Sequence, residues 1–505
     1  MIWCSLPISF LLLSLAGCGG NAAIPVESQA RSSASAEAAA TKPSQAPPVS
    51  PAKSVANEVN SPPDGGRESP LSSSVTSRPT APLVQSVVRP PDRRPRHDDR
   101  RLAEAGIHLY ESKRLKLYTD IDPEIARTLP PLIDQAYEAW EAYFGPLPPD
   151  PARSEFQLTG YIMADRPLFQ KLGLEPVDLQ DFINGRHRGY QFWMYDQDLD
   201  YYRRHLMIHE ATHCFMTIMP RVVLPPWYLE GTAELFGMHA LTDDGRLELR
   251  ILPDDPNHWG RIRLIQEEIA AGRLREFDDV RHLEPDDFLS DKAYAWSWAL
   301  CAFLDRHPRY RERFQTLGRR LGERPFDELF DELFAADQSD LQEEWRLFAR
   351  GLCYGYDVER AAIDFAPGRP LSPGASAGCE IAADRGWQSS GVRLVAGKRY
   401  RISAAGQFAV GSVPKLWISE PQGVSIRYFD GRPLGMVLGT LRADPVNHAA
   451  RESSMADVLP VGRETEWTVP FDGTFYLRVN DAWNELRDNS GSVQVRIEEV
   501  AAVAE

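Results

Sequence analysis

The feature that most constrains folding is a long stretch without aromatic residues near the start of the chain. From Gly19 to about Arg101 there is no Phe, Trp or Tyr, and Pro, Ser and Ala dominate. Such a segment cannot bury enough apolar surface to offset the entropy lost on ordering. We therefore expect residues 19–105 to form a disordered linker that its many prolines keep extended.

Residues 1–18 have the pattern of an export signal. The apolar stretch Phe10–Leu15 is too short to span a bilayer and fits the core of a signal peptide. The sequence Leu15-Ala16-Gly17-Cys18 resembles a bacterial lipobox, which implies acylation at Cys18. Residues 1–7 lack the Lys or Arg that usually opens a signal peptide, and a secreted form without the lipid is the alternative. We expect a protein of the bacterial cell envelope, held to a membrane by a lipid on Cys18.

Charge and cysteine content narrow the possible partners and crosslinks. A formal net charge of −16 argues against a nucleic-acid partner. Beyond Cys4 and Cys18, four cysteines remain, and in an exported protein they allow three disulfide connectivities. A bond from Cys353 to Cys379 would join two predicted folded parts. Cys214 and Cys301 lie in helical patterns, where buried thiols are the simplest interpretation.

The pentapeptide His209–His213, His-Glu-Ala-Thr-His, carries the clearest chemical signal. Apolar residues before it recur at helical spacing, and Asp198 or Asp200 is available as an N-cap. Histidines at i and i+4 share a helix face, so both imidazoles can reach a single metal ion. Glu210 is placed to act on a metal-bound water.

A second acidic segment follows the pentapeptide closely. Pro225 and Pro226 interrupt the chain, and residues 227–239 read as a new helix with Pro226 near its first turn. Glu230 and Glu234 are four residues apart and share a face of that helix. Glu230 can supply a third metal ligand. The alternative is that the histidines are ordinary core or surface residues and the glutamates a solvated stripe.

These two segments together resemble the gluzincin metallopeptidases, in particular the peptidase MA-like family. There a His-Glu-x-x-His helix precedes a segment Pro-x-Trp-x-x-Glu-Gly-x-Ala, which residues 225–233 match. The resemblance covers roughly residues 115–304. It implies that His209, His213 and Glu230 are zinc ligands, that Glu210 is the general base, and that Glu234 orients a ligand histidine.

A tyrosine completes the set that the resemblance implies. Related gluzincins carry one at a similar distance after the third ligand, and Tyr294 falls there, at the start of an apolar helix. Its expected role is to donate a hydrogen bond to the developing oxyanion. A helix aromatic packed in the core is an equal alternative for Tyr294.

The surrounding pattern predicts an α+β domain over residues 106–365. Strands are expected at 115–119, 156–163 and 189–195, and a helix at 123–144. Further helical patterns cover 259–272, 293–304, 310–321 and 341–352. Gluzincin folds place their last sheet strand along the cleft, where a peptide can pair with it, and residues 191–195 are the candidate edge.

From about Pro370 the pattern changes to strands. Residues 392–404, 474–481 and 491–497 alternate apolar and polar side chains. Residues 370–500 resemble the β-sandwich of calcium-dependent galactose-binding lectins, on the segments 435–439, 479–481 and 488–491. The resemblance implies hard oxygen ligands for Ca²⁺, which these side chains can supply: Asn480, Asp481, Asp488 and Asn489. The same residues are good turn formers, and a turn without metal is the preferred interpretation.

The sequence thus predicts a multidomain chain, with an α+β zincin-like catalytic domain followed by an all-β, galactose-binding-like sandwich. The expected activity is zinc-dependent hydrolysis of a peptide bond in a peptide or protein substrate. The Gly-x-Met-Glu-Asn signature of aminopeptidases in this clan is missing, so an endopeptidase is favoured. One alternative is a carbohydrate-binding surface protein with a degenerate peptidase part, which the presence of Glu210 argues against. The other is a zinc amidase of cell-wall peptides.

Overall fold

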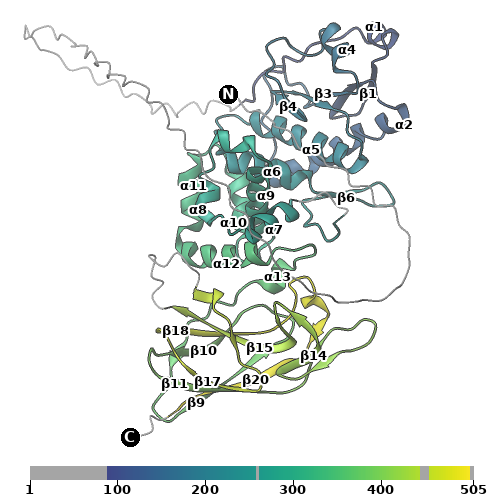
Figure 1. Cartoon of the computed structure of the whole chain (residues 1–505). Coiled ribbons are helices and arrows are strands. Elements are labelled where there is room, and N and C mark those ends of the chain that lie inside the picture. Colours follow the sequence, from purple (N-terminus) through teal and green to yellow (C-terminus); the bar gives the residue numbers. More distant parts are fainter. Residues whose placement is uncertain (1–87, 257–260, 444–453, 501–505) are drawn as a thin grey trace, which may run out of the picture. The chain divides into compact units, whose positions relative to one another are not determined.

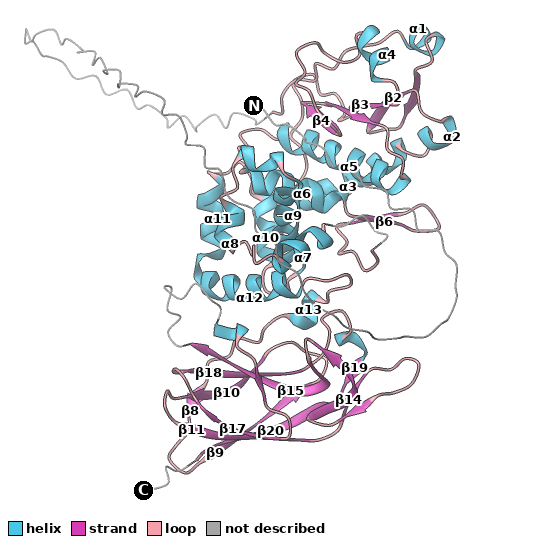
Figure 2. Cartoon of the chain, viewed as in Figure 1, coloured by secondary structure: helices cyan, strands magenta, loops and turns pink. Residues whose placement is uncertain are grey.

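The structure is a computed structural model that describes residues 88–256, 261–443 and 454–500 (Figure 1). The predicted signal peptide and lipid-bearing Cys18 lie outside the described residues. The described chain is mixed α/β, with helices and a sheet first and a β-rich region from Arg369 onward (Figure 2). Among the described helices, none combines the length and the apolarity that crossing a membrane requires.

A five-stranded sheet opens the described chain, with strand order β1-β2-β3-β5-β4. The three inner strands run parallel, and the two outer strands are antiparallel to their neighbours. The bounds are β1 His108–Glu111, β2 Leu115–Thr119, β3 Leu158–Met163, β4 Gly185–Arg188 and β5 Gln191–Tyr195. All six residues of β3 are buried, as expected of a central strand covered on both faces.

The helix that carries the pentapeptide packs on one face of this sheet. It is α5, Asp200–Thr217, and α3, Pro130–Phe144, lies beside it (Figure 2). Apolar side chains of both helices share one core with strand residues such as Leu117, Phe192 and Met194. The opposite face carries a smaller apolar cluster around Tyr161 and Trp193.

The predicted edge strand is wrong. Residues 191–195 form β5, which pairs with β3 on one side and with β4 on the other. The edge of the sheet is β4, because the chain turns at Gly189 and Tyr190 and places the preceding residues outermost. Polar β4, Gly-Arg-His-Arg, lacks the apolar alternation that makes strands readable from sequence.

Two predictions around helix starts are also corrected. The helix expected over 123–144 is two helices, α2 Pro123–Ala126 and α3, since Pro130 and Pro131 fit only in a first turn. Neither Asp198 nor Asp200 caps α5: the N-cap is Leu199, with no side-chain cap bond. Asp200 is the first helical residue and pairs with Arg203 instead.

The remaining helices follow α5 in sequence, and most of them pack against α9. They are α6 Pro226–Gly237, α7 Ile262–Ala270, α8 Phe277–Arg281, α9 Asp291–Arg306, α10 Arg311–Arg319, α11 Phe326–Phe334, α12 Gln338–Gly351 and α13 Val358–Ala361. Short helices α1 Asp99–Glu104 and α4 Arg166–Lys171 precede α5, and a two-stranded sheet of β6 His239–Leu241 and β7 Leu247–Leu249 follows α6. The unpredicted α11 presents Phe326, Leu329, Phe330 and Phe334 to the core at helical spacing.

The β-rich region consists mainly of two sheets that share one apolar core. The main path of the first is β14-β15-β18-β10-β8, and the second is β17-β11-β20-β9. The bounds are β8 Arg369–Pro370, β9 Ser376–Ala382, β10 Gln388–Leu394, β11 Arg399–Ala405, β14 Gln422–Phe429, β15 Arg432–Ala443, β17 Glu464–Thr468, β18 Gly473–Val479 and β20 Ser492–Glu499. Smaller strands are β12 Phe408–Val410, β13 Ile418–Ser419, β16 Leu459–Pro460 and β19 Asn489–Ser490.

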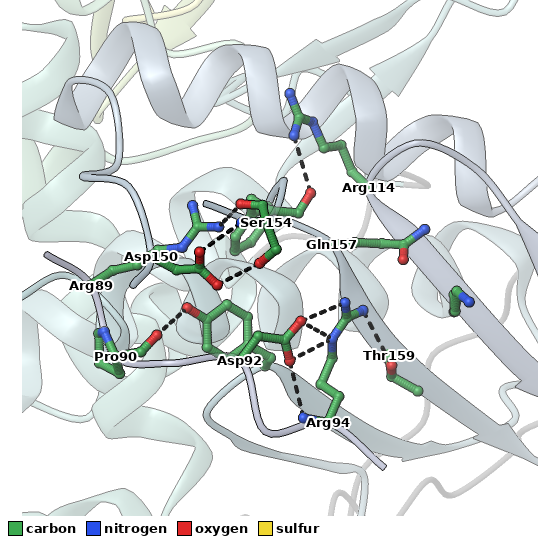
Figure 3. A network of polar contacts seen from close by, with 12 residues as sticks. Arg89, Pro90, Asp92, Arg94, Arg114, Asp150, Ser154, Gln157 and Thr159 are labelled. Atoms are coloured by element: carbon green, nitrogen blue, oxygen red, sulfur yellow. Dashed lines mark hydrogen bonds and ion pairs between the residues drawn. The ribbon is translucent and has the colours of Figure 1, made fainter. Parts of the chain in front are cut away.

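The linker predicted for residues 19–105 is too long at its C-terminal end. From Val88 the chain is ordered and attached to the sheet, as Figure 3 shows. Arg89 donates to the Ser154 carbonyl at 2.7 Å, and Arg94 forms a forked pair with Asp92. Arginine and aspartate pairs thus order a segment that has no aromatic residue to bury. Residues 19–87 lie outside the described part.

The cysteines in the described residues are free thiols: Cys214, Cys301, Cys353 and Cys379. Cys214 and Cys301 are buried, and burial raises the pKa of both. The Cys353–Cys379 bond considered from the sequence is not formed.

Candidate metal centre

The two histidines of the pentapeptide converge on one point beside the sheet. His209 and His213 are one turn apart on α5, both are buried, and their Nε2 atoms are 3.0 Å apart. The helix is buried along almost all of this stretch, because it lies between the sheet and α6. At this distance the two nitrogens can share either a hydrogen bond or a cation.

Glu230 joins them from α6. Its Oε2 lies 3.1 Å from Nε2 of His213 and 3.5 Å from Nε2 of His209. One ligand atom from each of the three residues falls within 4.8 Å of the others, so this buried group can hold a metal ion. Burial alone would raise the pKa of Glu230, but His213 and His209 outweigh it and hold that pKa well below its ordinary value. An ionised carboxylate with two imidazoles fits the donor set of zinc.

Glu234, one turn further along α6, lies behind His209. Its Oε1 is 3.5 Å from Nδ1 of His209, and its Oε2 is 3.5 Å from Nε2 of His205. Arg261, which is also buried, donates two hydrogen bonds to the same carboxylate, at 2.8 Å from Nη2 to Oε1 and at 3.1 Å from Nε to Oε2. His205, His209 and Glu234 form a second group of metal-binding type. Arg261 already neutralises Glu234, which favours orientation of His209 over a second cation.

Glu210 faces the same space from the side of the edge strand. It is buried, and Gly185 of β4 lies so close that a Cβ there would be 2.5 Å from its Oε1. His187 of β4 has Nδ1 3.5 Å from its Oε2 and stacks on the His213 ring at 4.5 Å between centroids. Burial lowers the pKa of His187, and His213 acts in the same direction.

Tyr294 reaches the site from the first turn of α9. Its ring centroid is 6.5 Å from that of His209 and 5.1 Å from that of Phe288. Burial raises the pKa of its hydroxyl well above the ordinary value, so it is a neutral donor. The ring packs against Phe288 and also borders the cleft, and the donor role of Tyr294 stays a prediction.

A cleft of about 200 Å³ opens at His209, His213 and Glu230, the residues that can hold a metal ion. Glu210, His187 and Tyr294 lie in its wall together with the three predicted ligands. An apolar side of the wall comes from α5, α6 and their connection: Met216, Val222, Val223, Leu224 and Leu229. The arrangement can bind a cation, place a carboxylate base beside it, and take an apolar group of a substrate.

Three side chains at the site were not predicted from the sequence. His205 precedes His209 by four residues on the same helix, so helical spacing could have found it. His187 and Arg261 come from β4 and from the start of α7, and nothing in their own segments indicates the site. Only the strand order and helix packing bring them there.

In the β-rich region the predicted calcium residues lie around the start of β19 and the end of β18. The Nδ2 of Asn480 donates to the carbonyls of Phe429, Arg432 and Pro433. Asp488 accepts a long bond of 3.4 Å from the Ser412 amide. Within the described residues, Oδ2 of Asp481 and Oδ1 of Asn489 are buried without a hydrogen-bond partner. Burial, with a contribution from Glu485, raises the pKa of Asp481 to about 6.

No protein-family model matches the chain, and no curated protein matches it. Among solved structures, a PllA-like lectin, the N-terminal domain of EclA, is 24% identical over 24% of this chain and 95% of its own, with a TM-score of 0.19. The IMPa metallopeptidase from Pseudomonas aeruginosa is 11% identical over 77% of this chain and 46% of its own, with a TM-score of 0.15. The same enzyme in complex with T-antigen gives 11% identity over 78% and 47%, with a TM-score of 0.15. TM-scores this low leave both as weak likenesses, to a metallopeptidase and to a lectin.

Proposed function

We propose that the chain is a zinc-dependent peptidase, an endopeptidase of the gluzincin type, that acts at the bacterial cell envelope. The observation that carries this proposal is the buried convergence of His209, His213 and Glu230 with Glu210 beside them. A purely structural zinc site has no need of a carboxylate base at its open side. Glu210 therefore favours a catalytic over a structural metal.

The proposal gives each of these residues a role that its position supports. His209, His213 and Glu230 would hold Zn²⁺, and a zinc ion bound there supplies a Lewis acid and lowers the pKa of water. Glu210 accepts the proton of the attacking water and delivers it to the leaving amine. Tyr294 donates toward the carbonyl oxygen as negative charge develops. Glu234, held by Arg261, fixes the ring of His209.

A mixed peptide library tests this function directly. We expect the wild-type chain to cleave it, cleavage to stop on treatment with a zinc chelator, and Glu210→Gln to reduce the rate by about 10³-fold or more. The matched control is Glu138→Gln, an exposed glutamate on α3, which should cleave as the wild type does. Cleavage that survives both Glu210→Gln and the chelator would contradict the proposal.

The same assay separates the amidase alternative. A zinc amidase of cell-wall peptides would leave the peptide library intact and release fragments from purified peptidoglycan.

Membrane attachment through Cys18 is a further part of the proposal. It is tested by incorporation of labelled fatty acid, which Cys18→Ala should abolish.

A second candidate function, calcium-dependent carbohydrate binding, rests on the β-rich region. The unpaired buried oxygens of Asp481 and Asn489 support it, because burying unsatisfied oxygens is costly and a hard cation would satisfy them. Calorimetry with CaCl₂ and then galactose tests it, with Asp481→Asn as the variant that should lose the calcium signal. If no heat of calcium binding is measured, the interpretation of these residues as a turn without metal stands.

A further inference from the structure

The edge strand β4 is packed directly against the carboxylate of Glu210. A Cβ at Gly185 would lie 2.5 Å from Oε1 and 2.9 Å from Cγ of Glu210, so a side chain there would displace the carboxylate. The backbone there is not in the left-handed region, so the need for glycine arises from space alone. The strand thus closes one side of the base.

His187 lies two residues further along the same strand and on the same face. Its Nδ1 is 3.5 Å from Oε2 of Glu210, a distance at which catalytic hydrogen bonds are often found when no substrate is bound. Its ring lies nearly parallel to that of His213, at 23° and 4.5 Å. The imidazole is therefore fixed between the predicted base and a predicted metal ligand.

The chemistry of the pair determines which nitrogen carries the proton. An ionised carboxylate only accepts hydrogen bonds, so a favourable contact with Oε2 requires the proton on Nδ1 of His187. A neutral ring in that tautomer has a lone pair on Nε2, and His187 lines the cleft. Gly185 on one oxygen and His187 on the other then leave Glu210 little freedom to rotate.

We propose that His187 is a positioning residue for the base: its Nδ1–H holds Oε2 of Glu210 and sets the carboxylate against the edge strand. The inference deepens the proposed peptidase function and rests on it for its purpose. The contact itself is a property of the protein that does not depend on turnover. A misplacement of about 1 Å of a catalytic group costs about 10²-fold in rate.

The first test reads the tautomer of His187 in the full-length protein, without any substrate. Two-bond ¹H–¹⁵N correlation spectra of ¹⁵N-histidine-labelled chain distinguish Nδ1–H from Nε2–H, and His187→Asn identifies the signal by its loss. We expect Nδ1–H in the wild type and a shift toward Nε2–H in Glu210→Ala. A wild-type ring protonated on Nε2 alone would overturn the proposal whether or not the chain is a peptidase.

The second test uses the two amides that mimic the two ring nitrogens. The amide nitrogen of asparagine replaces Nδ1, and that of glutamine reaches the place of Nε2. We expect His187→Asn to keep kcat within about tenfold, and His187→Gln and His187→Ala to lose about 10²-fold with little change in KM. Zinc content should stay at the wild-type level in all three.

The control pair is His108→Asn and His108→Gln, at an exposed histidine on β1, the opposite edge of the same sheet. Both should match the wild type. Retention of activity by glutamine but not asparagine would assign the function to Nε2 and overturn the proposal, as would full activity in every variant. If the wild type cleaves nothing, the proposed function fails, and the tautomer measurement alone decides the inference.

Discussion

Two glutamates one helical turn apart have different surroundings and so different expected roles. Glu230 approaches Nε2 of both histidines, whereas Glu234 approaches Nδ1 of His209 from behind and is held by Arg261. The first can bind a metal at the open side of the imidazoles. The second, already paired with Arg261, is better placed to fix the ring and its tautomer.

This difference predicts unequal losses of zinc affinity. Glu234→Gln should weaken zinc binding about 10- to 100-fold, the usual cost of losing a partner of a ligand histidine. Glu230→Gln should weaken it further, because a ligand charge is removed. Competition with a chromophoric chelator measures both values. Equal affinities in wild type and Glu234→Gln would show that Glu234 serves only the Arg261 pair.

Asp481 gives a prediction about pH. Its pKa is raised to about 6 in the folded chain by burial and by Glu485, with Arg478 and Asn489 opposing, against about 3.9 when unfolded. The folded state therefore binds more protons between about pH 4 and pH 6, and stability falls as pH rises through that window.

The variant Asp481→Asn avoids this loss because an amide does not ionise. Without calcium, it should exceed the wild type at pH 8 by about 2 kcal/mol in free energy of unfolding, and by much less at pH 4. Urea unfolding at the two pH values measures the difference. A gain that is the same at both values would exclude ionisation as its cause.

The residues of the candidate site could largely be predicted from the sequence, whereas the residues that surround them could not. The spacing within His209–His213 and the glutamates of the next helix indicated residues that the structure does bring together. Their roles as ligands and base stay predictions. His187 and Arg261 are contributed by long-range packing, which leaves no local pattern in the sequence.

At the scale of elements, the close approach of α6 and α9 places the third predicted ligand. Gly231 makes that approach possible, since a Cβ there would meet the Ser297 carbonyl oxygen and lie 2.7 Å from Cys301 Sγ. Residue 231 follows Glu230 directly. A displacement of α6 at this point therefore changes the position of Glu230 relative to the histidines.

Gly231→Ala should accordingly lower both stability and metal affinity. Overpacking of a dense core typically costs about 1–3 kcal/mol, and zinc affinity should fall because Glu230 moves. Thermal unfolding and chelator competition measure the two effects. Gly378→Ala in β9 is the control, since its nearest contact would be 3.7 Å away. An unchanged Gly231→Ala protein would mean that α6 can shift without consequence.

Elements with strong patterns were predicted well, and their pairing was not. Strand β2 has the predicted bounds, Leu115–Thr119, because its apolar residues alternate with Lys116 and end at an aspartate. Strand β4 was not predicted, because Arg186 and Arg188 interrupt any apolar pattern. The sheet edge that β4 forms was therefore not predicted either. Strand order depends on contacts between distant segments, which no local period records.

At the scale of the whole molecule, the change from helices to strands near Arg369 is the predicted one. The structure adds that ordered chain begins earlier than residue 105, through the arginine and aspartate contacts of Figure 3. Composition alone could not show this, because Arg89 and Arg94 also contact Ser154 and Thr159, far along the chain. Attachment to a membrane remains a proposal.

A metal bound within the helical core should stabilise the whole folded chain. Zinc binding to the folded state alone contributes about 4 kcal/mol when its concentration is a thousand times the dissociation constant. We expect chelator treatment to lower the thermal midpoint and stoichiometric zinc to restore it. His209→Ala should show the lower midpoint in both conditions. A midpoint insensitive to chelator and zinc would indicate that the group binds no metal.

The most direct measurement is elemental analysis of zinc in the purified chain, beside Glu210→Gln and His213→Ala, with each protein also tested on the peptide library. We predict about one zinc per chain in the wild type and in Glu210→Gln, little in His213→Ala, and cleavage by the wild type alone. Zinc retained in His213→Ala, or no zinc in the wild type, would contradict the metal centre on which the proposed function depends.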